Sequence, residues 1–249
     1  MAGNPDYEFG HGAYLTNLRR RIGISNDDTR PMADMLRVRH GTYQRWENDR
    51  ENIHKEVIAR ARDIDRAQMA AITKLIDEIP PGADRHEVTV HRGDPAAERW
   101  NQIVMLARYL DPRIAPILGT GSDGWLFNIR RQLALSVNAM ADQLSVRKTT
   151  FQRWEAGTDP IHPDVVSRVD ALVAWQGRTI DWVTEDARIN EDEAIIYRDS
   201  DHYPETSVGV DDWNHAVMLG ILKNPEIKPV YLMVNTPRRE RPRRGSRGR

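Results

Sequence analysis

The sequence predicts a mainly helical protein that contains one structural unit twice, with a small α+β part in each copy. Residues 32–48 read MADMLRVRHGTYQRWEN and residues 140–156 read MADQLSVRKTTFQRWEA, with 11 of the 17 positions identical at a constant offset of 108. Around both stretches, apolar residues recur at intervals of three and four, which indicates helices that bury one face. We therefore expect a tandem duplication over residues 14–117 and 125–232.

The similarity between the copies continues on both sides of this stretch. Upstream, LTNLRR at 15–20 corresponds to LFNIRR at 126–131. Downstream, Trp100-Asn101 corresponds to Trp213-Asn214, and the VML at 104–106 corresponds to the VML at 217–219. Residues 118–124 read LGTGSDG, which is rich in turn formers, and we interpret them as a linker between the copies.

Four helices are expected at the start of each copy. In the second copy, apolar spacing predicts a helix over 125–135, a short helix capped by Ser136, a third over 148–156 and a long fourth over 164–185. Gly157 follows the third helix as a stop signal. The first copy repeats this order, with Pro31 at the start of its second helix and a long helix over 55–79.

A small α+β part is expected after each long helix. Residues 87–92 and 194–198 are typical of short strands. A helix starting near Trp100 or Trp213 follows, and it stops at Pro112 or Pro225. An extended piece then closes each copy, over 115–118 and 228–234.

Two short helices joined by a tight turn, held by a first and a fourth helix, are typical of the DNA-binding helix-turn-helix. We therefore divide the chain into a flexible arm, two helix-turn-helix domains each followed by a small α+β subdomain, a linker and a disordered arginine-rich tail. Their ranges are 1–13, 14–79, 80–117, 118–124, 125–189, 190–236 and 237–249.

Composition limits the other classes of function. The net charge is −1, but residues 238–249 hold seven arginines and one glutamate, so +6 lies in the tail and −7 in the remainder. The chain has no cysteine, which excludes disulfides, zinc ribbons and cysteine catalysis. Without a glycine-rich phosphate loop, HExxH or GxSxG motif, we expect no enzyme, no cofactor and no metal. With neither a secretory signal nor a long apolar run, we expect a cytoplasmic, nucleoid-associated protein.

The second copy has the pattern MAxxLxVxxxTxQRWExG and so resembles the XRE/Cro–C1-type helix-turn-helix superfamily. Each copy also resembles the anti-CRISPR-associated phage autorepressors, through its RWE helix end, the PDVV at 163–166 and the GxDDWNxAVML at 209–219. The resemblance implies a lambda-repressor-like helical bundle and a small dimerisation-like subdomain in each half. It implies a sequence-specific transcriptional regulator of phage or prophage type that represses its own promoter.

Family members are homodimers, so the resemblance implies a covalently fused pseudo-dimer that is a monomer in solution and reads an imperfect palindrome in double-stranded DNA. By this analogy, base-reading residues lie at the start and on the outer face of each third helix: His40, Gly41, Gln44, Arg45, Lys148, Thr149, Gln152 and Arg153. Phosphate contacts are expected from arginines just before that helix and on the first helix: Arg39, Arg147, Arg19, Arg20, Arg130 and Arg131.

Two other functions fit the sequence. One is an RNA-binding or architectural protein that uses the arginine-rich tail as its main nucleic-acid contact. The other is a protein-interaction adaptor built on a helix-turn-helix scaffold, which the acidic body permits. The aromatic residues at 43, 46, 151 and 154 are expected in the core, and His54 and His162 at a helix end or a phosphate.

Overall fold

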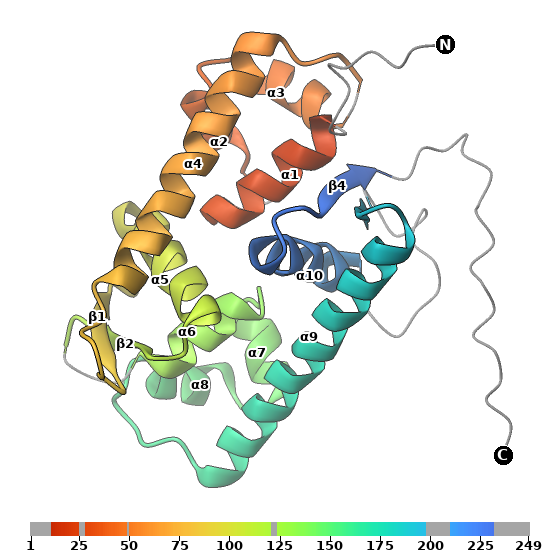
Figure 1. Cartoon of the computed structure of the whole chain (residues 1–249). Coiled ribbons are helices and arrows are strands. Elements are labelled where there is room, and N and C mark those ends of the chain that lie inside the picture. Colours follow the sequence, from red (N-terminus) through yellow and green to blue (C-terminus); the bar gives the residue numbers. More distant parts are fainter. Residues whose placement is uncertain (1–10, 25–27, 49, 121–123, 198–209, 232–249) are drawn as a thin grey trace, which may run out of the picture.

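The computed structural model describes residues 11–24, 28–48, 50–120, 124–197 and 210–231. This part of the chain is mainly helical and contains two small sheets of two strands each (Figure 1). Most of the expected arm (1–13) and the whole arginine-rich tail lie outside the described residues.

The helices and strands follow the same order in residues 11–118 and 125–231. The first stretch contains α1 (His11–Ile22), α2 (Arg30–Met35), α3 (His40–Glu47), α4 (Lys55–Asp77), β1 (His86–Val90), the 3₁₀ turn η2 (Pro95–Ala97), α5 (Glu98–Leu110) and β2 (Ile114–Leu118). The second contains α6 (Trp125–Gln132), α7 (Val137–Gln143), α8 (Lys148–Glu155), α9 (Pro163–Ile189), β3 (Glu193–Ile196), α10 (Val210–Lys223) and β4 (Lys228–Tyr231).

The bounds differ from the sequence-based ones mainly at helix ends. Helix α1 begins at His11, inside the segment expected as a flexible arm, because Ala13 is fully buried against the central part of the molecule. Helix α6 ends at Gln132, before the expected residue 135, because Ala134 adopts a left-handed conformation. Helix α9 continues to Ile189, since Val183 and Ala187 are buried in the same central region.

Each small sheet consists of two parallel strands joined by one crossover helix. Strand β1 pairs with β2 in the register His86↔Ile114, and β3 pairs with β4 in the register Glu193↔Lys228. Parallel strands need a long connection, and α5 and α10 provide it. The sequence predicted these strands and helices but not their parallel pairing.

A Trp-Asn pair fixes the crossover helix to the first strand of its sheet. Trp100 Nε1 donates to the carbonyl of Thr89 at 2.7 Å. The Asn101 side chain accepts from the backbone N–H of His91 and donates to the carbonyl of the same residue, both at 2.9 Å. In the second half the same bonds are made by Trp213, Asn214, Ile195 and Tyr197. These bonds satisfy the backbone at the end of each strand and explain the repeated Trp-Asn dipeptide.

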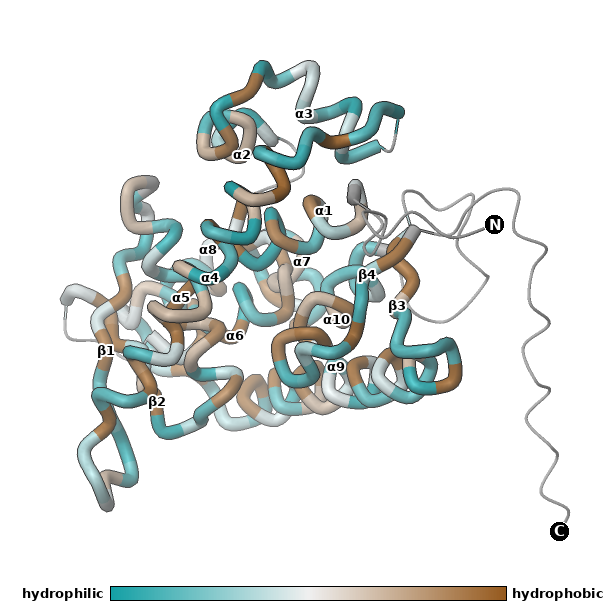
Figure 2. The backbone as a smooth tube through the Cα atoms, turned by 45° about the horizontal axis from the view of Figure 1, so that its top comes forward, coloured by the Kyte–Doolittle hydropathy of each residue, from teal (hydrophilic) through white to brown (hydrophobic). Residues whose placement is uncertain are grey.

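Buried apolar residues form three cores. Two outer cores fill the bundles of α1–α4 and α6–α9. The third core lies between them and joins α5, α10, both sheets and the C-terminal parts of α4 and α9. Figure 2 shows the apolar residues along α10 and β2 that belong to this core. The two small parts therefore share one core.

The first helix of each half packs on the small part of the other half. Helix α1 contacts β4 and α10, whereas α6 contacts α5 and β2. Ion pairs accompany this packing: Arg20 Nη2 lies 2.8 Å from an oxygen of Asp211, and Arg131 Nη1 lies 2.6 Å from an oxygen of Glu98. The packing is reciprocal, as in the two-fold interface of a homodimer.

Gln102 and His215 occupy equivalent positions, directly after the repeated Trp-Asn dipeptide, and both lie close to these ion pairs. Gln102 donates to the carbonyl of Arg20 at 3.3 Å, and His215 Nε2 lies 2.7 Å from the carbonyl of Gln132. Burial lowers the pKa of His215 to about 4, and the charge of Arg20 acts in the same direction. His215 is therefore neutral at pH 7 in the folded protein.

We expect His215→Gln, which introduces the amide found at position 102, to weaken the pH dependence of stability. The pKa of His215 is about 4 in the folded protein, whereas the ordinary value for histidine is 6.5. The unfolded chain therefore binds more protons below pH 6.5, and the stabilisation present above pH 6.5 is lost as the pH falls toward 4. Between pH 7 and pH 5 the loss is on the order of 2 kcal/mol. Urea unfolding of the wild type and of His215→Gln at pH 7 and pH 5 measures this loss of stability. An equal loss in the two proteins would contradict the prediction.

We expect Ala134→Gly to stabilise the protein by about 0.5–1 kcal/mol. Ala134 has φ +56°, and Gly23 occupies the corresponding end of α1 with φ +88°. Glycine adopts this conformation without the strain of a Cβ atom. Gly23→Ala should be destabilising, because its Cβ would also lie 3.1 Å from the Gln102 side chain. Ala59→Gly, at an exposed position of α4, is the control and should cost about 1 kcal/mol. Urea midpoints measure all three, and destabilisation by Ala134→Gly would refute the interpretation.

Candidate nucleic-acid interface

Each half contains two short helices joined by a tight turn with a left-handed residue. This residue is Arg37 (φ +56°) between α2 and α3, and Ser145 (φ +52°) between α7 and α8. An arginine of the long helix closes each turn: Arg60 Nε donates to the carbonyl of Leu36 at 3.0 Å, and Arg168 Nη1 to the carbonyl of Leu144 at 2.5 Å. The helices of the two pairs therefore meet at turns built in the same way.

Aromatic residues hold the inner face of α3 and α8, as the sequence predicted. Tyr43 and Phe151 are fully buried, Trp46 is 3% exposed and Trp154 is half-buried in its bundle core. His54 and His162 take the N-cap positions of α4 and α9. These aromatic contacts leave the opposite face of each short helix toward solvent.

Most of the predicted base-reading residues lie on this outer face. Those with exposed side chains or backbone are Gly41, Gln44, Arg45, Lys148, Thr149 and Arg153. His40 and Gln152 are half-buried, and His40 Nε2 lies 2.9 Å from the hydroxyl of Thr29. Arg39 and Arg147 are exposed at the N-cap positions of α3 and α8. An exposed cation there stands beside the free backbone N–H groups of a helix N-terminus, which also bind phosphate.

The other four predicted phosphate contacts are paired with carboxylates of the chain itself. Arg19 Nε lies 2.7 Å from Glu47, and Arg130 Nε lies 2.5 Å from Glu155. Arg20 and Arg131 make the ion pairs between the halves that are described above. The exposed fractions of the four side chains are only 4% to 15%. We therefore remove them from the predicted phosphate contacts, because α1 and α6 turn these side chains toward α3, α8 and the other half.

Glu155 at the end of α8 is the most deeply buried carboxylate of this region. Its side chain is 1% exposed and lies between Arg130 at 2.5 Å and Arg92 at 3.1 Å. Arg92 follows β1, so it connects the first half to the outer helix of the second. Sequence reasoning missed this role, although Glu47 and Glu155 both end the repeated QRWE and an arginine precedes each at 19 or 130.

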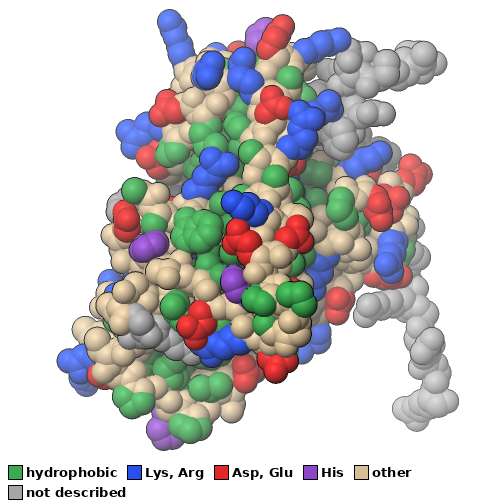
Figure 3. Space-filling model, turned by 60° about the vertical axis from the view of Figure 1, so that its left-hand side comes forward, with side chains coloured by type: hydrophobic (Ala, Val, Ile, Leu, Met, Phe, Trp, Pro, Cys, Tyr) green, Lys and Arg blue, Asp and Glu red, His purple; other side chains and the backbone are tan. Residues whose placement is uncertain are grey.

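Basic and polar groups are distributed unequally over the surface. Lys and Arg side chains, with acidic ones between them, gather at the end of the molecule that α2, α3 and the start of α4 form (Figures 1 and 3).

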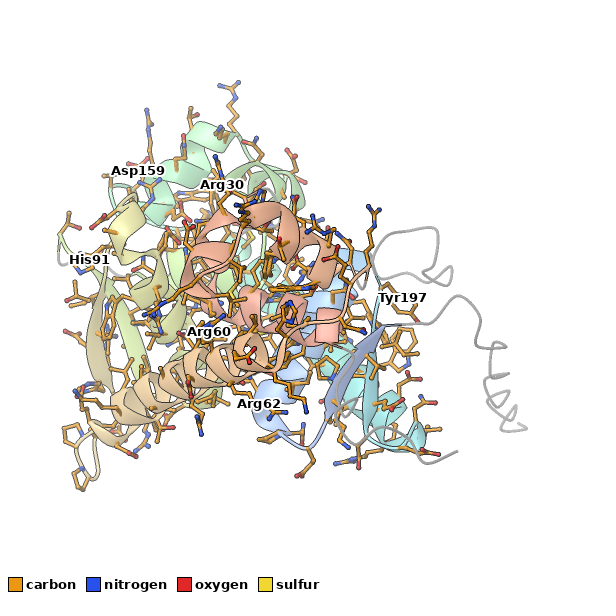
Figure 4. The ribbon with its side chains drawn as sticks, turned by 90° about the horizontal axis from the view of Figure 1, so that it is seen from above. Arg30, Arg60, Arg62, His91, Asp159 and Tyr197 are labelled. Atoms are coloured by element: carbon orange, nitrogen blue, oxygen red, sulfur yellow. The ribbon has the colours of Figure 1, made fainter. Side chains whose placement is uncertain are left out.

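Seen from this end in Figure 4, Arg30 of α2 and Asp159 after α8 lie on one side of the molecule, and Arg62 of α4 lies on the other. The two short-helix pairs therefore have parts that face the same side, away from the exposed side of α4.

No protein-family model, no curated protein and no solved structure matches this chain. In the part of the chain that the structure describes, no helix combines the length and the apolar character needed to cross a bilayer. The same residues contain no group of three or more acidic or histidine side chains placed to hold a metal ion.

We expect Glu155→Gln to destabilise the protein by about 3–5 kcal/mol, because it leaves two poorly exposed guanidinium groups without their carboxylate. Glu47→Gln is the matched variant in the first half. It should cost less, since Glu47 is 12% exposed, whereas Glu155 is 1% exposed and lies between two arginines. Denaturant unfolding followed by tryptophan fluorescence measures both. A loss below about 1 kcal/mol for Glu155→Gln would show that solvent screens this cluster.

Proposed function

We propose that the protein is a sequence-specific double-stranded DNA-binding transcriptional regulator, whose two halves are fused helix-turn-helix units. The observation that carries the proposal is the exposed outer face of α3 and α8. In both helices the aromatic residues face the core, and a Gln-Arg pair occupies the same place in the sequence. A helix of this kind fits the major groove, because its neighbours hold its inner face and leave its outer face free.

The chemistry of the outer faces supports base recognition. An arginine donates two hydrogen bonds to O6 and N7 of guanine, and a glutamine pairs with adenine, each worth about 1–3 kcal/mol of discrimination. Arg45 and Arg153 supply the first group, and Gln44 and Gln152 the second. Arg39 and Arg147, at the helix N-termini, are proposed to contact phosphates and set the position of each helix on the duplex.

The packing between the halves supports a pseudo-dimer. In homodimeric regulators of this type, two-fold symmetry sets the distance between two half-sites at roughly 34 Å, one helical turn of DNA. Here the reciprocal contacts of α1 and α6 with the opposite small part take the place of that symmetry. Because both units belong to one chain, binding needs no dimerisation, and the second unit acts at a high effective concentration.

The two units are proposed to read related but unequal half-sites. Lys148 and Thr149 at the start of α8 are both exposed, whereas the corresponding positions of α3 hold His40 and Gly41. The ring of His40 already contacts the hydroxyl of Thr29, the N-cap residue of α2. The shared Gln-Arg pair predicts common base pairs, and the different starts predict differences, so the operator is an imperfect palindrome. We infer repression of the protein's own promoter from the sequence resemblance.

We expect the wild-type protein to enrich a two-part motif from a library of random DNA duplexes. Arg45→Ala and Arg153→Ala should each relax one half of the motif, at a cost of about 1–3 kcal/mol, because each removes one bidentate base contact. Arg188→Ala at the end of α9 is the control for losing one exposed arginine and should keep both halves.

Sequencing of the selected duplexes measures this directly. Binding without enrichment, falling steeply with salt, would contradict base reading and favour an architectural or RNA-binding protein. Competition by RNA separates those two, and deletion of residues 237–249 tests how much the tail contributes to either.

A further inference from the structure

We propose that Glu51 and Asp159 determine specificity by holding Arg45 and Arg153 in the orientation that selects guanine. The inference rests on the proposed function, because it concerns the same outer faces of α3 and α8. The two carboxylates follow these helices in the chain, and the sequence by itself did not single them out. Their numbers differ by 108, the offset of the repeat, as do those of the arginines.

Both arginines pair with the carboxylate that follows their helix. Arg45 Nε lies 2.6 Å from Oε1 of Glu51, and the two side chains are 46% and 45% exposed. Arg153 Nη1 lies 3.8 Å from Oδ2 of Asp159, with exposed fractions of 68% and 44%. Partial exposure leaves the remaining guanidinium N–H groups accessible to a ligand.

The backbone places each carboxylate by the same turn. The N–H of Arg50 donates to the carbonyl of Arg45 at 2.8 Å, and the N–H of Thr158 donates to the carbonyl of Arg153 at 3.0 Å. Glu51 and Asp159 are the next residues after these two donors. The two carboxylates therefore follow equivalent backbone hydrogen bonds to the carbonyl of the arginine that they pair with.

A carboxylate in this position has two effects on DNA binding. It restricts the rotation of a long side chain before the base is met, which lowers the entropy lost on contact with guanine O6 and N7. It also repels phosphate and offsets part of the attraction of the arginine for any backbone. The first effect strengthens binding to the right base, and the second weakens binding to all other DNA, so together they raise specificity.

The two halves differ in how firmly the arginine is held. Arg45 also donates from Nη2 to the hydroxyl of Thr42 at 3.2 Å, and its carboxylate is 1.2 Å nearer than that of Arg153 (3.8 − 2.6). The half-site of α3 is therefore expected to discriminate guanine more strongly than the half-site of α8.

The test measures the affinity of the full chain for the selected operator, and for operators with guanine replaced by adenine or 7-deazaguanine in one half-site. Glu51→Gln should reduce guanine discrimination in its half-site by roughly fivefold or more, the low end of one bidentate contact. It should also raise affinity for unrelated duplexes. Asp159→Asn should have a smaller effect in the other half-site. Glu56→Gln is the control, because it removes a nearby exposed charge at the start of α4.

Each outcome decides the proposal. If Glu51→Gln and Glu56→Gln raise the affinity for all duplexes equally and leave guanine discrimination unchanged, Glu51 acts only by repulsion and the inference is wrong. If the wild type selects a motif without guanine at the position that Arg45→Ala relaxes, the inference also fails but the proposed function stands. If the wild type selects no sequence at all, both fail together. Thermal unfolding of the variants establishes that each is folded.

Discussion

The reciprocal packing of α1 and α6 on the opposite small part is the constraint on which the rest of the molecule depends. Each first helix belongs to its own bundle through one face, and contributes Ala13 or Phe127 to the central core through another. The cores of the two bundles and the central core are therefore linked through these two helices. The bundles cannot change their relative position without breaking apolar contacts and two ion pairs, which fixes the relation between α3 and α8.

The same constraint explains why four arginines of α1 and α6 have internal partners. A helix that packs on two sides has little surface left for solvent, and a guanidinium buried there needs a carboxylate or carbonyl to offset its desolvation. Arg19 and Arg130 meet the glutamate that ends the outer helix of their own bundle, whereas Arg20 and Arg131 meet the other half. The proposed reading helices are thus held in place from both the bundle and the central core.

The two halves differ where the packing allows it. Trp213 is 1% exposed and lies against Trp182 and Tyr197, whereas Trp100 keeps the equivalent hydrogen bond to its strand but is 38% exposed. His215 and Gln102 likewise make related bonds with different chemistry. Under the proposed function, such divergence is available to a fused chain and not to a dimer of identical chains, and it permits an operator with unequal halves.

The sequence by itself determined the order of helices and strands in both halves and the aromatic residues that hold α3 and α8, because these follow from local periodicity and an internal repeat. It also placed Gln44, Arg45 and Arg153 at the outer positions of their helices. The tertiary structure decided the parallel pairing of strands, the merging of two small parts into one core, and the direction of each arginine on α1 and α6. Periodicity shows that a residue lies at the edge of an apolar face, but a long charged side chain there can turn either to solvent or to a carboxylate of another segment. Which of these occurs depends on partners such as Glu47, Asp211 and Glu98, which are brought close only when distant segments pack together.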